Sequence, residues 1–283
     1  MQHGTPSITA MRVAMRRAAH QIYDRPLVLD DPIALAIMGE ERCDKLRNDP
    51  TTQAMPMAVA MRAFMAGRSR FAEDHLAEAV KNSATQYVVL GAGLDTFAHR
   101  NPFSHLRVFE VDFPATQTWK HEMLTQAGLP IHPPNLTYAP VDFESDTLAH
   151  GLEAAGFDPT QKTFFSWLGV VPYLTLEGFR STLAFTATLP KGSGLAFDYG
   201  LPRESLSFTG KMIFDYISAR VRRAGEPFQL FFTPEQIAAE LTTAGYQTIE
   251  DLGPTELTAR YFANRQDSLA VRGNVGHLIC GWL

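Results

Sequence analysis

The stretch Val88–Thr96, VVLGAGLDT, decides the fold class of this chain. Its apolar beginning predicts a buried strand, and Gly91 and Gly93 let the backbone turn sharply where that strand ends. They also let a ligand approach without a Cβ in the way. The dinucleotide-binding fingerprint would have a third glycine at Thr96, and its absence argues against a pyrophosphate seat. We therefore expect a parallel-sheet strand whose carboxyl end holds a ligand without a pyrophosphate, with Asp95 among the binding residues.

An acidic residue follows at the distance that a ribose requires. The next expected strand, Arg107–Asp112, ends nineteen residues after Gly93. A carboxylate there, about 20 residues beyond the glycines, is placed to accept hydrogen bonds from a ribose diol. Asp112 is the first candidate, and Glu110 is the alternative because the two share a strand face. S-adenosylmethionine has a ribose and an adenine but no phosphate, so these features favour it as the cofactor.

The other parts of this cofactor need partners of their own. Its carboxylate favours a fixed arginine, and Arg68 and Arg70 stand at the start of an expected helix over residues 69–82. That helix leads away from the ligand edge by about 21 Å, and the following strand returns by about 17 Å. Both arginines should therefore lie near the glycines, where the helix N-terminus adds a preference for an anion. Asp142-Phe143, just past the third strand, is the expected adenine position.

Strands alternate with helices over most of the chain. We expect strands over residues 86–90, 107–112, 136–141, 163–168, 193–199, 246–252 and 276–283. We expect helices over residues 6–23, 33–38, 51–66, 69–82, 114–127, 147–155, 175–189 and 234–244. This alternation predicts an α/β protein with a mainly parallel seven-stranded sheet covered on both faces. The last two strands have no expected helical crossover between them, which indicates an antiparallel last strand, as is typical of Rossmann-like class I methyltransferases.

Two segments lie outside this alternation. Residues 1–68 are an expected N-terminal helical cap, and residues 69–283 are the expected domain that binds S-adenosylmethionine. Within that domain, residues 201–232 are an insert with apolar residues at helical spacing, which we interpret as a helical lid. Both segments could cover the carboxyl edge of the sheet, where ligands bind in such folds. The alternative is that they only thicken the core.

The composition excludes several classes of function. The chain has 283 residues, of which 45% are hydrophobic and 19% charged, and its net charge is −5. Because there is no basic surplus, we expect neither a nucleic-acid partner nor a membrane partner. Cys43 and Cys280 indicate no disulfide framework, and the N-terminal residues show no signal peptide or membrane span, so a cytoplasmic protein is expected. The histidines and cysteines lack metal-ligand spacing, and we expect no metal.

Several segments resemble a known family. They are Arg68–Phe71, Leu90–Thr96, Phe109–Pro114 and Ser166–Leu174. The chain resembles the leucine carboxyl methyltransferase family of S-adenosylmethionine enzymes, especially its bacterial branch of O-methyltransferases, some of them in secondary metabolism. For the cofactor's carboxylate, methionine portion and ribose, the resemblance implies Arg68, Gly91 and Asp112. For its adenine, the resemblance implies Asp142 with Phe143.

One position departs from the family pattern. The family usually has a glutamate after the fourth strand that touches the cofactor, and Leu168 stands in its place here. The resemblance then implies that the amino group of the cofactor is held by a backbone carbonyl, or less tightly. The family's named activity, methylation of the C-terminal leucine of a protein, is not transferred to this chain.

Methyl transfer from a sulfonium is an in-line displacement, for which alignment and exclusion of water matter most. A carboxylate acceptor needs no base, whereas a phenol or an alcohol is helped by one. Base candidates near the carboxyl edge are Tyr199 and Tyr173, then Asp198, with His20 more distant. We therefore expect an O-methyltransferase acting on a carboxylate or hydroxyl of a small molecule. The alternatives are an NAD(P)-dependent Rossmann oxidoreductase and a non-catalytic protein that binds S-adenosylmethionine.

Overall fold

A computed structural model describes residues 8–142, 146–223, 225, 227–267, 269–273 and 276–283 of the chain. Within them, one sheet contains β1 (Gln86–Leu90), β2 (Arg107–Asp112), β3 (Leu136–Pro140), β4 (Thr163–Trp167), β5 (Gly194–Gly200), β6 (Thr248–Leu252) and β7 (Gly276–Trp282). Their order across the sheet is β3-β2-β1-β4-β5-β7-β6. Strands β1 to β5 are parallel to one another, and β7 is antiparallel to both β5 and β6. This arrangement confirms the predicted Rossmann-like class I methyltransferase fold.

The middle of the sheet is buried on both faces. Every residue of β1 and β4 is buried, and these two strands pair side by side. Because helices cover both faces, the strands are continuous apolar runs without an exposed alternate face. This is why strand positions could be read from the sequence to within about two residues at most ends.

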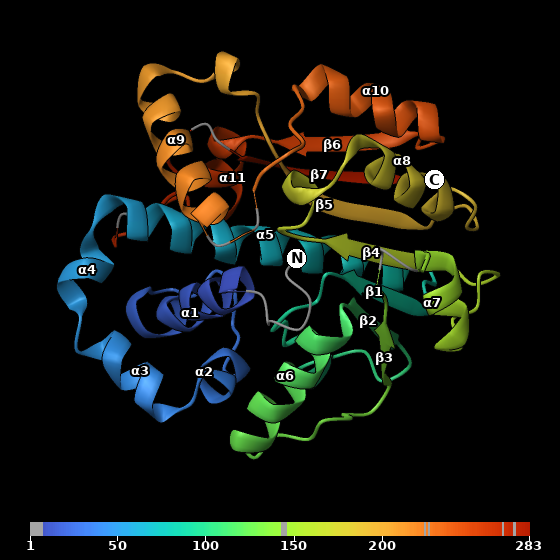
Figure 1. Cartoon of the computed structure of the whole chain (residues 1–283), viewed down its shortest axis with the longest axis horizontal. Coiled ribbons are helices and arrows are strands. Elements are labelled where there is room, and N and C mark those ends of the chain that lie inside the picture. Colours follow the sequence, from blue (N-terminus) through green and yellow to red (C-terminus); the bar gives the residue numbers. More distant parts are fainter. Residues whose placement is uncertain (1–7, 143–145, 224, 226, 268, 274–275) are drawn as a thin grey trace.

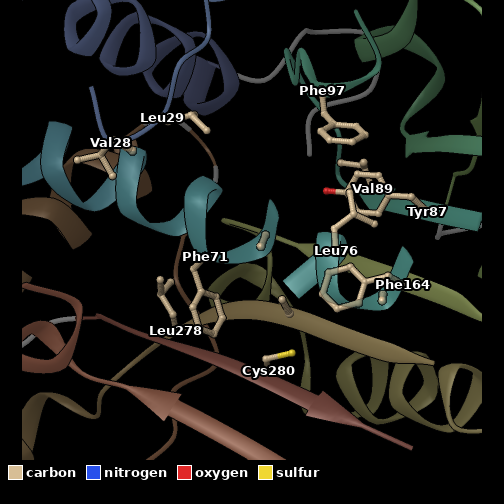
Figure 2. Packing of buried hydrophobic residues seen from close by; sticks show 14 of the residues in the cluster. Val28, Leu29, Phe71, Leu76, Tyr87, Val89, Phe97, Phe164, Leu278 and Cys280 are labelled. Carbon is tan, nitrogen blue, oxygen red and sulfur yellow. The ribbon is translucent and has the colours of Figure 1, made fainter. Parts of the chain in front are cut away.

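Helices surround the sheet (Figure 1). Their bounds are α1 (Ile8–Tyr23), α2 (Ile33–Met38), α3 (Glu40–Arg47), α4 (Pro50–Ala54), α5 (Pro56–Lys81), α6 (Pro114–Gln126), α7 (Leu148–Ala154), α8 (Leu176–Thr186), α9 (Phe208–Arg223), α10 (Pro234–Ala244) and α11 (Pro254–Tyr261). Helices α5 and α11 pack on one face of the sheet, and α7, α8 and α10 pack on the other. Figure 2 shows Phe71 and Leu76 of α5 directed toward Leu278 of β7 and Phe164 of β4.

Helices α1 to α4 and α9 lie on the side toward which the arrows of β4 and β6 point (Figure 1). That side is the carboxyl edge of the parallel strands, where ligands bind in such folds. The start of α1 reaches the glycine loop, because a Cβ built on Gly93 would lie 3.0 Å from the Cβ of Ala10. Among the described residues, no helix is long and apolar enough to cross a membrane.

Helix α5 differs from the prediction. Residues 51–66 and 69–82 were expected as separate helices, but α5 runs without a break from Pro56 to Lys81. The expected break at Ser69 is wrong because Ser69 is buried within the helix, and the neighbouring Gly67 packs against the ring of Phe262. Tertiary packing here overrides the local preference of glycine and serine for helix ends.

Three smaller differences concern the connections. Helix α3 was not expected, and its short charged sequence buries only Cys43 and Leu46. Helix α11 was not expected either, so β6 and β7 pair antiparallel as predicted but are not joined by a simple hairpin. Between β1 and β2 there is only a 3-10 turn, Phe97–His99. The glycine loop is therefore not followed by the α-helix N-terminus that a pyrophosphate would need.

Candidate functional site

The glycine loop at the end of β1 is held by the neighbouring strand. The amides of Gly91 and Ala92 donate to the carbonyl of Val111, at 2.8 and 3.1 Å. A Cβ on Gly91 would lie 2.4 Å from Cγ2 of Val170, so no larger residue fits there unless the side chain of Val170 moves. The loops after β1 and β4 therefore meet at the carboxyl edge of the sheet.

Asp112 fixes the other side of this loop. Its carboxylate accepts hydrogen bonds from the amide of Gly93 at 2.5 Å and from the amide of Phe113 at 2.7 Å. Burial raises the pKa of Asp112 above its ordinary value, against these hydrogen bonds. A carboxylate offers about four acceptor positions, so these two amides do not occupy all of them. Asp112 is thus in the position where the sequence predicts a ribose acceptor.

Glu110 lies deeper in the protein on the same face of β2. Its Oε2 is 2.5 Å from Nζ of Lys120, and both side chains are 1% exposed. Among the described residues its Oε1 has no hydrogen-bond partner. Burial raises the pKa of Glu110 to about 7 although Lys120 opposes the shift. Because Glu110 is enclosed and ion-paired, we keep Asp112 as the first candidate for the ribose.

Asp95 joins the glycine loop to the N-terminal helices. One of its oxygens is 3.1 Å from Nη1 of Arg17 in α1, and the other accepts from the amide of Phe97 at 2.8 Å. Nη2 of Arg17 also contacts Asp31 and Thr96, at 2.5 and 2.6 Å. The Asp95 carboxylate, proposed from sequence as a cofactor ligand, is therefore held by Arg17 in this arrangement. Sequence reasoning missed Arg17, because its partners Asp31, Asp95 and Thr96 lie on other segments of the chain.

Arg68 reaches the same edge of the sheet from α5. Its Nη1 lies 3.2 Å from Oδ2 of Asp198 on β5, and both residues are buried. The amide of Gly169, after β4, donates to the other oxygen of Asp198. A continuous chain of contacts thus leads from Gly91 through Val170 and Gly169 to Arg68.

The prediction for Arg68 and its neighbour is only partly confirmed. Arg68 lies near the glycine loop as predicted. The part of α5 that follows Arg68 and strand β1 run in opposite directions over similar lengths, wherever the helix begins. The expected helix N-terminus beside it is absent, since Arg68 lies in the middle of α5. Arg70 points to the solvent-exposed side and pairs with Asp74 at 2.7 Å. Of these two arginines, Arg68 is the one buried at this edge.

Gly169 offers a test of the contact with Arg68. Its φ is +74°, and a Cβ there would lie 2.9 Å from Nη1 and 3.0 Å from Nη2 of Arg68. We predict that Gly169→Ala weakens binding of S-adenosylhomocysteine at least fivefold in calorimetry, because the guanidinium must move. Gly39→Ala is the matched control, since Gly39 has the same φ and nothing within 4 Å of its Cβ position. Both variants should lose about 1–2 kcal/mol of stability, but equal affinities for the nucleoside would contradict the prediction.

The other proposed cofactor residues are placed as follows. Asp142 follows β3 and is half-buried. Phe143 lies outside the described residues. Leu168 is half-buried and packs against the hydrophobic cluster under α5. Its side chain therefore supplies no polar contact to the cofactor.

Of the two proposed catalytic tyrosines, Tyr199 is part of a hydrogen-bonded group. Its hydroxyl donates to Oδ2 of Asp251 on β6 at 2.7 Å, and Oδ1 of Asp251 is 3.2 Å from Nδ1 of His277 on β7. The rings of Tyr199 and His277 are 5.3 Å apart. Burial and the neighbouring Asp251 raise the pKa of Tyr199 far above its ordinary value, so the hydroxyl is a neutral donor. Tyr173 lies in the turn after β4, with its ring 5.1 Å from that of Phe228.

His20, the distant base candidate, is engaged in structural hydrogen bonds. Its Nδ1 is 2.9 Å from Asp24, and its Nε2 accepts from the amide of Val28 at 3.1 Å. Both ring nitrogens are thus used within the N-terminal helices. In the part of the chain that the structure describes, no group of three or more histidine, cysteine, aspartate or glutamate side chains could hold a metal ion.

Comparisons with known proteins identify the family and support the fold. Residues 10–187 match the model of the family "Leucine carboxyl methyltransferase". A similar protein of Bacillus subtilis, named "Putative S-adenosyl-L-methionine-dependent methyltransferase YktD", is 34% identical over 95% of this chain and 96% of its own length. A crystal structure described as "a putative methyltransferase from Thermobifida fusca" matches with a TM-score of 0.56 at 17% identity, covering 99% of this chain and 96% of that one. A DUF574 family protein of Streptomyces avermitilis matches with a TM-score of 0.53 at 15% identity, covering 94% and 96%.

The residues at this edge suit the cofactor of that family. The close approach of Arg68 to Gly169 leaves no room for a Cβ, and the site provides a buried cation, a buried carboxylate and a second carboxylate on β2. A molecule with a zwitterionic end and a ribose matches these groups. The chain belongs to the leucine carboxyl methyltransferase family, and it is an S-adenosylmethionine-dependent methyltransferase.

Proposed function

We propose that the enzyme transfers the methyl group to an oxygen atom of a small molecule, a carboxylate or a hydroxyl. The observation that carries this proposal is a hydrogen-bonded group on three adjacent strands. It consists of Tyr199 on β5, Asp251 on β6 and His277 on β7. A histidine oriented by a carboxylate is a suitable acceptor for the proton of a hydroxyl. The name of the family also supports oxygen, since it describes methylation of a carboxyl group.

The cofactor, when bound, supplies a methyl group that its sulfonium has already activated. The protein then has to align the acceptor oxygen and exclude water, an effect worth up to about 7–11 kcal/mol in well-oriented reactions. In our proposal the cap, residues 1–68, and the lid, residues 201–232, perform the second task. The start of α1 at Gly93 and the position of α9 beyond the strand ends support these roles (Figure 1). A role in secondary metabolism is a further part of the proposal and rests on the resemblance alone.

Family membership sets aside both the nicotinamide-dependent and the non-catalytic alternatives. The type of acceptor can be tested directly. Methyl-labelled S-adenosylmethionine would be offered with carboxylic acids, phenols and amines built on the same ring scaffolds. We expect label in acids or phenols and none in the matched amines. Mild alkali separates the two oxygen products, because methyl esters release methanol and aryl ethers do not. Label in the amines alone would overturn the proposal.

A base contribution can be tested with a pair of neighbouring variants. Asp251→Asn removes the carboxylate that orients His277 and should slow transfer to phenols at least tenfold while leaving transfer to carboxylic acids nearly unchanged. Glu250→Gln is the control, because Glu250 is the adjacent residue of β6 and pairs with Arg260 and His75 instead. Equal slowing of both acceptor classes by Asp251→Asn would indicate a structural role for this group.

A further inference from the structure

A buried ion pair stands beside the glycine loop. Arg68 of α5 and Asp198 of β5 are 130 residues apart in sequence, and their charged groups are 3.2 Å apart in space. Their side chains are only 7% and 9% exposed. Gly169, in the loop after β4, contacts both members of the pair. Its amide donates to Asp198, and a Cβ built on it would lie 2.9 Å from Nη1 of Arg68. The edge therefore presents one fixed positive and one fixed negative group side by side.

Both members of the pair have capacity for a further partner. A guanidinium has five N–H donors, and a carboxylate has about four acceptor positions. In the described part of the chain, Asp198 is the only hydrogen-bond acceptor of the Arg68 guanidinium. Asp198 itself accepts from Arg68 and from the amide of Gly169. Neither group is saturated by its present contacts.

The charge pattern matches a zwitterion better than a simple anion. The amino-acid end of S-adenosylmethionine carries a carboxylate and an ammonium group on the same carbon atom. An anion bound to Arg68 alone would compete with Asp198 and would bury one uncompensated negative charge, which is costly in a site with little solvent. A zwitterion adds no net charge, and each of its groups meets the opposite member of the pair. We propose that Asp198 binds the α-ammonium group of the cofactor while Arg68 binds its α-carboxylate.

Other side chains at this edge do not provide the same contact. Leu168 packs against the hydrophobic cluster under α5. Asp112 is held on β2 by the amides of Gly93 and Phe113. Asp251 faces the other side of the sheet, together with Tyr199. Asp198 is the carboxylate in contact with Arg68, and this inference depends on the cofactor of the family but not on the type of acceptor.

Calorimetry with three nucleosides tests the proposal. They are S-adenosylhomocysteine, its analogue without the α-amino group, and its analogue without the α-carboxyl group. In the unaltered protein, removal of either group should weaken binding at least tenfold, about 1.4 kcal/mol. In Asp198→Asn, binding of S-adenosylhomocysteine should weaken at least tenfold, and removal of the amino group should then cost less than threefold. This loss of dependence on the amino group is the signature that a purely structural role of Asp198 would not produce.

Glu250→Gln is the control, because Glu250 of β6 also pairs with an arginine, Arg260, and does not touch Arg68. It should respond to the three nucleosides as the unaltered protein does. If Asp198→Asn does not fold, the unaltered protein still decides, since an amino group that can be removed without loss of affinity overturns the proposal. An equal cost of amino removal in Asp198→Asn and in the unaltered protein overturns it as well. A protein that does not bind S-adenosylhomocysteine at all would instead refute the whole cofactor site, and this inference with it.

Discussion

Asp112→Ala should lower the affinity for S-adenosylhomocysteine at least a hundredfold, about 2.8 kcal/mol. The variant loses two things at once. The amides of Gly93 and Phe113 lose the carboxylate that accepts their hydrogen bonds, so the glycine loop loses one of its contacts with the end of β2. The ribose hydroxyls lose their proposed acceptor, and hydrogen bonds to a charged group contribute about 1.5–3 kcal/mol each. Calorimetry at constant pH measures the change.

Two variants separate these effects. Asp112→Asn keeps an acceptor oxygen for one of the amides, so its affinity should fall by a smaller factor than that of Asp112→Ala. Glu110→Gln alters the neighbouring carboxylate on the same face of β2, which pairs with Lys120. Because Glu110 is enclosed, its variant should bind the nucleoside within a few-fold of the unaltered protein. Loss of affinity in Glu110→Gln with none in Asp112→Ala would assign the ribose to Glu110 instead.

Most of the strand positions could be predicted because their signals are local. The runs at β1 and β2 are apolar, bounded by glycine or an acid, and buried on both faces, so hydrophobic pattern alone locates them. The spacing along the chain likewise predicts the ligand loop, because Asp112 follows Gly91 and Gly93 at the distance that a ribose requires. The ribose side of the proposed site was therefore accessible without a structure.

The remaining features depend on contacts between distant segments. No local pattern predicts that Gly67 and Ser69 lie inside a helix, because the ring of Phe262 and the sheet below stabilise α5 there. The pairing of Arg68 with Asp198 spans 130 residues and requires the crossing of α5 over β5. Asp198 was considered from sequence only as a base, since its contact with an arginine was not visible. The strands of the site could be predicted from sequence, whereas the pairing of its polar side chains became visible only in the structure.

Arg17→Met should lower the free energy of unfolding by about 3 kcal/mol, the lower end of the range for breaking a buried pair. The guanidinium of Arg17 lies 2.5 Å from Asp31 and 3.1 Å from Asp95, and Asp31 is fully buried. Without Arg17, Asp31 keeps Arg100 at 3.4 Å and the hydroxyl of Thr96 at 2.8 Å, so its charge is not left alone. Urea unfolding at neutral pH measures the loss.

The controls follow from the same cluster. Arg16→Met changes the adjacent residue of α1, which is half-buried and has no ion pair among the described residues, and it should cost less than about 1 kcal/mol. Adding Asp31→Asn to Arg17→Met should recover part of the loss, because the variant then no longer buries a carboxylate that lacks its main partner. Arg17→Met should also weaken nucleoside binding, because Arg17 holds Asp95 of the glycine loop. Equal stability of the two arginine variants would mean that the cluster joins the N-terminal helices to the loop without stabilising either.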